Sequence, residues 1–317
     1  MQPPDPTLEE QVRALSRRLA EVESRVAALE GLPIEPAAEA DVATELLPAG
    51  YAVSFDARRW TTALGRSFII LGGAFLLRAI TDAGLWPPLV GVSVGLLFAF
   101  VWIASSDRAA ARGDRVHALS DGATALVIGF PLIVEAATRF RLFTADTAAV
   151  ALTAFSAIAL FSAWKSSLRA LAWLGTLGGM VTGLTLMVRI GVVAPYSLYF
   201  TALGVGALWL GYLREWKALR WPTGLLAVVG VAGVTARAVS EPPADPAGTA
   251  WFAQGALLLA YSASIAIRTL VRGRQVIVFE VVQTALVLVA GVGGALGVSR
   301  AAGEGGLVLG GALVVLG

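Results

Sequence analysis

The sequence predicts an all-α protein, in which a polytopic bundle of transmembrane helices follows a short N-terminal coiled-coil helix. Hydrophobic residues make up 57% of the 317 residues and charged residues only 15%, whereas about 25% of a typical soluble domain is charged. After residue 57 the chain contains nine apolar stretches of membrane-spanning length and a shorter tenth, and the polar gaps between them alternate between arginine-rich and arginine-poor. We therefore expect a coiled-coil helix (1–31), a flexible linker (32–57) and a transmembrane domain (58–317).

The N-terminal region has the residue spacing of a coiled coil. Apolar residues recur at alternating intervals of four and three, which keeps one apolar seam on a helix. The seam residues are Leu8, Val12, Leu15, Leu19, Val22, Val26 and Leu29. Residues 8–29 are therefore predicted to pair with a second copy of the chain or with a protein partner; a single amphipathic helix lying on the membrane or on the bundle is the alternative. Residues 32–57 are rich in Ala, Pro and acidic residues without periodicity, as is typical of a linker.

Nine stretches are long enough to cross a membrane, which takes roughly 20 apolar residues. They are 62–80, 86–104, 121–138, 147–164, 168–188, 192–213, 221–239, 249–267 and 276–298. The tenth begins near Gly305, and the 13 residues from there to Gly317 cover only about 20 Å as a helix. We therefore expect the transmembrane domain to be truncated, with the natural chain continuing beyond Gly317.

The distribution of Lys and Arg predicts the orientation, because cytoplasmic loops carry an excess of both. One side holds Arg58, Arg59, Arg66, Arg108, Arg112, Arg115, Lys165, Arg169, Arg214, Lys217, Arg220, Arg268, Arg272 and Arg274. The opposite side holds Arg78, Arg139, Arg141, Arg189, Arg237 and Arg300. The richer side, which includes the N-terminus, is predicted to be cytoplasmic.

Glycines at intervals of four predict close approach between helices. The clearest examples are Gly175, Gly179 and Gly183 in the fifth span and Gly293 and Gly297 in the ninth. The glycines around Gly293 lack both the spacing of a nucleotide-binding loop and a preceding strand, so no cofactor is expected.

Few ionisable residues fall inside the spans, and an insertion cost of at least ~2.5 kcal/mol makes each a candidate functional residue. Arg66 and Glu280 lie about one turn inside the cytoplasmic side, and Glu135 and Arg237 lie near the outer ends of their spans. These depths predict two ion pairs, Arg66 with Glu280 and Glu135 with Arg237. Snorkelling of each arginine to the nearer interface is the alternative, with structural hydrogen bonds for the glutamates.

The last two complete spans each carry a polar face. Glu280, Gln283 and Thr284 lie on one side of the ninth helix, and Gln254 and Tyr261 lie two turns apart in the eighth. Both faces are predicted to turn toward the bundle interior, where they would form the wall of a polar cavity.

Other residues predict breaks or ends of helices. Pro195 in the sixth span and Gly129 with Pro131 in the third are typical of broken helices, which line binding sites in transporters. Asp121 follows Ser120 and is predicted to cap the third span, a functional acid being the alternative.

Several motifs resemble a large bacterial family of multi-pass membrane proteins of unknown function. They are LAWLGTLGGMVTG at 171–183, Tyr199, and LREWKAL at 213–219, together with an opening span over 64–78 that is similar to the family's first span. The chain departs from the family pattern at Gly183, where Pro is usual, and at Leu89 and Val90, where a basic residue is usual. The resemblance implies this architecture, a longer natural chain and a location in the bacterial inner membrane, but no catalytic residue.

These observations favour a transporter-like protein or one that handles lipids or the cell envelope. A structural or assembly scaffold that recruits partners through the coiled coil is the alternative. An enzyme is disfavoured, because the chain has no Cys and its only His, His117, lies in a loop, so that neither Ser-His hydrolysis nor a multi-histidine or thiolate metal site is expected. A net charge of +2 argues against nucleic acid as a partner. The lipid bilayer is the expected surrounding.

Overall fold

The computed structural model describes residues 57–214, 216, 218–240, 247–271 and 277–302, and in the N-terminal region Arg18, Glu21 and Val22. Residues 1–56 and 57–317 are separate units. The three described residues of the first unit are helical and exposed. Most of the predicted coiled coil, the linker up to residue 56 and the tenth apolar stretch lie outside the described residues.

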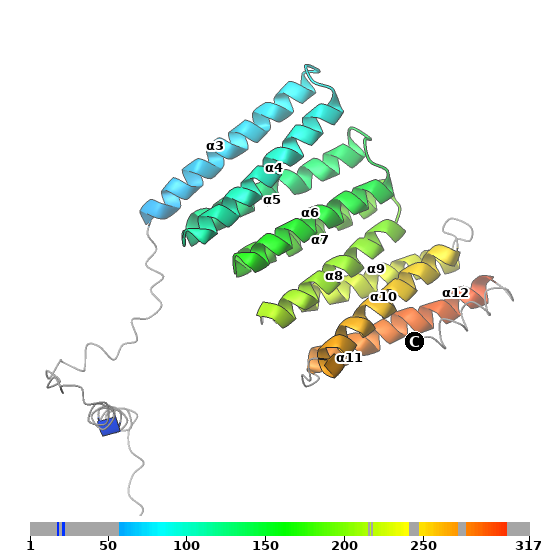
Figure 1. Ribbon diagram of the computed structural model, residues 1–317. Helices are drawn as coiled ribbons and strands as arrows, with labels where there is room; N and C mark the ends of the chain where they lie inside the picture. Colours follow the sequence, from blue (N-terminus) through cyan, green and yellow to red (C-terminus); the bar gives the residue numbers. More distant parts are fainter. Residues whose placement is uncertain are drawn as a thin grey trace, which may run out of the picture. The chain divides into compact units, whose positions relative to one another are not determined.

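The part of the second unit that the structure describes is helical and contains no strand (Figure 1). Its elements are α3 (Ala57–Asp82), α4 (Pro88–Ala111), α5 (Arg115–Thr138), α6 (Ala145–Lys165), α7 (Arg169–Ile190), α8 (Ala194–Arg214), α9 (Arg220–Ser240), α10 (Ala247–Ala266), η1 (Ile267–Val271), α11 (Val278–Leu288), η2 (Val289–Gly293) and α12 (Gly294–Ala302). Within these ranges nine helices are long and apolar enough to cross a membrane, the last being Val278–Ala301. The predicted fold class and its nine complete spans are confirmed.

Local sequence explains where α5 begins. Gly113 has a φ of 80°, a left-handed conformation that glycine adopts without steric cost and that ends the preceding helix. Asp114 then caps α5, because its carboxylate accepts a hydrogen bond from the His117 N–H at 3.2 Å. The expectation that Asp121 caps this span was wrong: the helix begins at Arg115, and Asp121 is fully buried inside it.

The helix breaks expected at Pro131 and Pro195 do not occur. α5 continues through Pro131 without interruption, and Pro195 occupies the first turn of α8, where a missing N–H leaves no helical hydrogen bond unmade. The departures from α-helical geometry are instead the widened π-helical turns η1 and η2. Such turns replace i→i+4 by i→i+5 hydrogen bonding and often occur at functional sites.

The helices form two rows in the bundle. One row contains α3, α5, α7, α9 and α11–α12, and the other contains α4, α6, α8 and α10; each helix packs on its neighbours in its own row and in the other. Figure 1 shows the succession from α3 to α12. Because successive spans reverse direction, helices within a row run parallel. The helices of the first row therefore begin, and those of the second row end, at the same end of the bundle. We call this the Arg-rich end and the opposite one the Arg-poor end.

Candidate functional site

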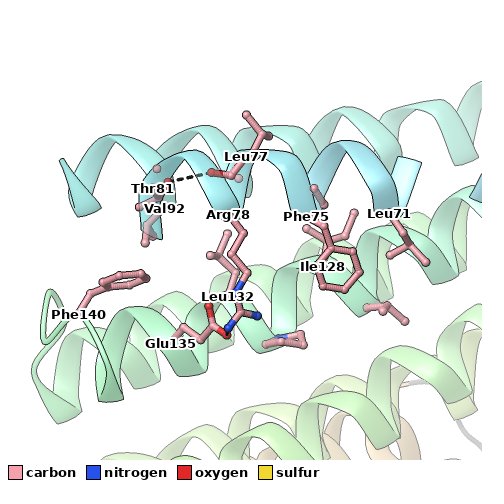
Figure 2. A pocket seen from close by; sticks show the side chains of 15 residues that line it. Leu71, Phe75, Leu77, Arg78, Thr81, Val92, Ile128, Leu132, Glu135 and Phe140 are labelled. Atoms are coloured by element: carbon pink, nitrogen blue, oxygen red, sulfur yellow. Dashed lines mark hydrogen bonds and ion pairs between the residues drawn. The ribbon is translucent and has the colours of Figure 1, made fainter. Parts of the chain in front are cut away.

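A cavity of about 270 Å³ lies between α3, α4 and α5 (Figure 2). Its walls are mainly apolar and include Leu71 and Phe75 from α3, Val92 from α4, and Val127 and Leu132 from α5. Phe75 and Val127 are 63% and 59% exposed. The cavity therefore opens on the surface of the bundle that faces lipid.

α3, the first described helix of its row, buries little of its surface against its neighbours. Only 11% of the α3 span is buried, against 50% of the α5 span. Contact between α3 and α4 is close near Thr81, where a Cβ on Gly91 would lie 2.1 Å from the Thr81 hydroxyl oxygen. Leu132 of α5 likewise packs onto Gly95 of α4, where an added Cβ would lie 2.6 Å from the leucine side chain. Because Gly91 and Gly95 have no side chain, α3 and α5 approach α4 closely at these two points, next to the cavity.

Charged side chains occupy the Arg-poor end of the cavity. Arg78 Nη2 lies 2.7 Å from Glu135 Oε1, and Figure 2 shows the two side chains pointing toward one another. Asp82 lies 3.7 Å from the Arg78 Nε and 3.0 Å from Arg139 Nη1. The resulting chain of two cations and two anions has no net charge. Its members are 20% to 50% exposed, so each pair contributes only about 0–1 kcal/mol to stability.

A second ion pair holds α3 at the Arg-rich end. Arg66 Nη2 lies 3.0 Å from Asp121 Oδ2, and it also donates to the Ser105 hydroxyl at 3.2 Å. Ser105 in turn donates to the same Asp121 oxygen at 2.8 Å. The Arg66 guanidinium lies 5.1 Å from the centre of the Trp102 ring, within the range of a cation–π contact. One arginine of α3 is therefore bound to both α4 and α5.

Hydroxyl groups extend this contact between α3 and α5. The Ser67 and Ser120 hydroxyl oxygens are 2.6 Å apart, and Thr124 donates to Ser67 at 3.0 Å. Ser120 also donates to the Ala63 carbonyl at 3.2 Å. Polar contacts thus attach α3 at both of its ends, while the apolar cavity lies between them.

The two ion pairs expected from depth alone were wrong. Arg66 pairs with Asp121 and not with Glu280, and Glu135 pairs with Arg78 and not with Arg237. The two residues of each predicted pair lie at the same end of the bundle, but their helices are not neighbours in the row. Among the helices that the structure describes, α3 contacts only α4 and α5, whereas α11 packs against α9 and α10, so side chains on α3 and α11 do not meet.

Glu280 belongs to a buried cluster at the Arg-rich end of α8, α10 and α11. It is fully buried, forms an ion pair with Arg268 of η1, and accepts a hydrogen bond from the Tyr212 hydroxyl at 2.8 Å. Its other oxygen accepts from the Ile277 N–H at 3.0 Å, which caps α11. This carboxylate is therefore satisfied by three donors.

The remaining polar residues of the last two spans pack between helices. Gln283 donates to the Gly224 carbonyl at 3.1 Å, and Gln254 donates to the Thr235 hydroxyl at 2.8 Å. Tyr261 is 1% exposed, and its hydroxyl has no hydrogen-bond partner among the residues described. Thr284 is half-buried. Arg237 donates to the Gly191 carbonyl at 2.6 Å.

The predicted packing glycines differ in their surroundings. An added Cβ at Gly179 would lie 2.3 Å from the Tyr199 hydroxyl, and one at Gly183 would lie 2.6 Å from the Phe200 ring. At Gly175 the nearest atom would be 3.7 Å away, an ordinary contact. At Gly293 and Gly297 no described atom lies within 4 Å. Close packing therefore centres on Gly179 and Gly183.

Sequence reasoning missed the residues that define the cavity and its supports. Asp121 was assigned to a helix end, although the Gly113–Asp114 pair carries the signal of a helix stop followed by an N-cap. With α5 beginning there, Asp121 falls one to two turns inside a span, where a carboxylate needs a partner. Arg78 was counted only among the positive charges of the opposite side and not among the ionisable residues inside spans, yet it lies on the last turns of α3.

No group of three or more His, Cys, Asp or Glu residues that could hold a metal ion occurs within the described ranges. Comparison of the chain with protein-family models, curated proteins and solved structures found no match. The nine apolar helices of the described part are compatible with a multi-pass membrane protein in a lipid bilayer.

Proposed function

We propose that this protein handles lipids within the membrane, by binding an acyl chain of one amphiphilic molecule in the cavity between α3, α4 and α5. One observation carries the proposal: a single cavity combines apolar walls, an opening on the lipid-facing surface and a charged end. An amphiphile has the two matching parts, a hydrocarbon chain and a polar headgroup.

The apolar lining favours a lipid over a hydrophilic solute. A polar group that enters such a cavity without finding a partner loses its hydrogen bonds to water, at a cost of roughly 2–7 kcal/mol. A lipid chain has no such cost. The volume of about 270 Å³ lies near the lower limit of small-molecule pockets, which begin at roughly 300 Å³, so it suits part of one chain.

The charged end supplies the selectivity in this proposal. An acyl chain that moves from the bilayer into the cavity exchanges one apolar surrounding for another, so burial of the chain gives little driving force. Arg78 and Arg139 offer donors to the headgroup, and Glu135 and Asp82 offer acceptors. Because these four groups have no net charge together, a zwitterionic or polar headgroup matches them better than a strongly charged one.

The proposal also assigns the cavity to a leaflet. The excess of Lys and Arg at the Arg-rich end favours a cytoplasmic location for that end. The headgroup would then lie in the outer leaflet of the bacterial inner membrane.

Photo-crosslinking tests the proposal. The protein is reconstituted in nanodiscs that contain a trace of phosphatidylcholine with a photoreactive group on one acyl chain, and labelled peptides are mapped. Labelling is expected to concentrate on α3, α4 and α5 around the cavity. Ala74→Trp places an indole in the cavity and is expected to abolish this labelling.

Ala79→Trp is the matched control, since Ala79 is exposed on the same helix and does not line the cavity. It is expected to leave the labelling pattern unchanged. Labelling spread evenly over all lipid-facing helices, or equal loss in the two variants, would contradict the proposal.

A further inference from the structure

The Glu280 cluster contains more positive than negative charge. Arg268 forms an ion pair with the one carboxylate of Glu280, and Arg220 of α9 stacks on the ring of Phe279, the residue next to Glu280; we count Arg220 as part of this cluster. The Arg268 guanidinium lies 4.7 Å from the centre of the Tyr212 ring. The Arg220 guanidinium lies 4.8 Å from the centre of the Phe279 ring.

Arg268 and Glu280 satisfy one another, but Arg220 has no such partner. Arg220 is only 7% exposed, and no hydrogen bond or ion pair joins its guanidinium to another described residue. Its Nε is fully enclosed and has no hydrogen-bond partner. The two terminal guanidinium nitrogens are not among the fully enclosed atoms that lack a partner. The terminal nitrogens are therefore the part of the side chain from which a ligand can be reached.

A cation in this position needs an anion. Taking one charge out of water costs several kcal/mol unless a counter-charge and hydrogen bonds replace the water, and the aromatic ring of Phe279 replaces only a small part of them. Glu280 already accepts from three donors. Among the described residues, the cluster is therefore short of one negative charge, on the side of Arg220.

The position of the cluster indicates what supplies that charge. Arg220 begins α9 and Arg268 follows the end of α10, so both lie at the Arg-rich end of the spans. Trp221, beside Arg220, is 47% exposed, as expected of a residue at the level of the lipid headgroups. Basic sites between transmembrane helices at this level bind the phosphate groups of anionic lipids.

We infer that Arg220, supported by Arg268, binds an anionic phosphate group at the Arg-rich end of α9. A guanidinium suits this ligand because its planar N–H groups match two phosphate oxygens at once. Either an anionic lipid headgroup or a free phosphate has this chemistry. The site lies at the end of the spans opposite to the charged end of the cavity, so it does not depend on the proposed function.

Nanodiscs of defined composition test the inference. The intact protein is placed in phosphatidylcholine alone, in phosphatidylcholine with phosphatidylglycerol, and in phosphatidylcholine with inorganic phosphate in the buffer. Native mass spectrometry counts retained phosphatidylglycerol, and the shift in the unfolding temperature gives an apparent affinity in each titration. The wild type is expected to retain phosphatidylglycerol or to respond to phosphate, and the arm that responds identifies the source.

Arg220→Gln is expected to weaken this response about tenfold or more, since hydrogen bonds to a charged group are lost. Arg214→Gln is the control: Arg214 lies at the same end but is exposed, and it donates to the Trp164 carbonyl at 2.8 Å. That variant is expected to respond as the wild type does. If neither titration moves the wild type, or if Arg220→Gln responds equally, the inference is wrong.

Arg220→Lys provides the test if Arg220→Gln does not fold. It keeps the charge but loses the planar donor pair, so the apparent affinity is expected to fall several-fold while the protein still inserts. An affinity unchanged in Arg220→Lys and equal retention of phosphatidylglycerol would overturn the assignment of the site to Arg220.

Discussion

The carboxylate of Asp121, fully buried in α5, lies 3.0 Å from the guanidinium of Arg66, which is 38% exposed on α3. The two partners therefore differ in what they lose when the other is removed. Asp121 without Arg66 is a buried charge whose nearest remaining donor is Ser105. Arg66 without Asp121 still reaches the interface with its long side chain.

This asymmetry predicts an order of stability for two variants. Arg66→Ala is expected to destabilise the protein by about 3–5 kcal/mol, because it leaves an uncompensated buried charge. Asp121→Asn is expected to cost about 1–3 kcal/mol, because it keeps the shape and one acceptor while weakening charged hydrogen bonds. Unfolding in detergent, followed by circular dichroism, measures both; the reverse order would contradict the buried pair.

Glu280 and Glu135 provide a second contrast between a buried and an exposed carboxylate. Glu280→Gln removes the only described anion beside Arg268 and Arg220 and is expected to destabilise by about 3–5 kcal/mol. Glu135→Gln breaks a pair whose side chains are 20% and 45% exposed, so less than about 1 kcal/mol is expected. The same unfolding measurement compares the two variants, and equal losses would argue against the burial of Glu280.

Gly179 predicts a packing effect. Its Cα lies against Tyr199, whose hydroxyl is 3.1 Å from that of Ser156. Gly179→Ala is expected to displace the tyrosine and cost about 1–3 kcal/mol. Gly72→Ala is the control, because an added Cβ there meets nothing within 4 Å, and a gain of up to about 1 kcal/mol is expected from the better helix former. A harmless Gly179→Ala would show that α7 and α8 are not in close contact there.

The orientation of the bundle is testable because the chain has no cysteine. Ala111→Cys at the Arg-rich end and Ala83→Cys at the Arg-poor end replace exposed alanines. If the protein is expressed in a Gram-negative host whose outer membrane has been permeabilised, a maleimide that does not cross the inner membrane is expected to label the cysteine at 83 only. Labelling at 111 alone would reverse the assignment of the two ends.

The nine spans were predictable because each depends only on length and local composition, which a single sequence displays. The partners of the buried charges were not, and Arg66 shows why. Its position in the chain gives its depth in the membrane, which was sufficient to place it at the level of Glu280. Which helix lies beside α3 depends on the order of the two rows, and that order follows from packing between distant parts of the chain. Asp121 was missed for a different reason, a misplaced helix start.

The attachment of α3 has a mechanical consequence. The helix is fastened near Arg66 by Asp121 and near Arg78 by Glu135, and the stretch between faces the cavity. A helix held more firmly at two points than between them bends most easily between them. Outward bowing of this stretch would enlarge the cavity while both clamps stay closed, so the entry of a lipid chain would require bending of one helix and no exchange of ionic partners.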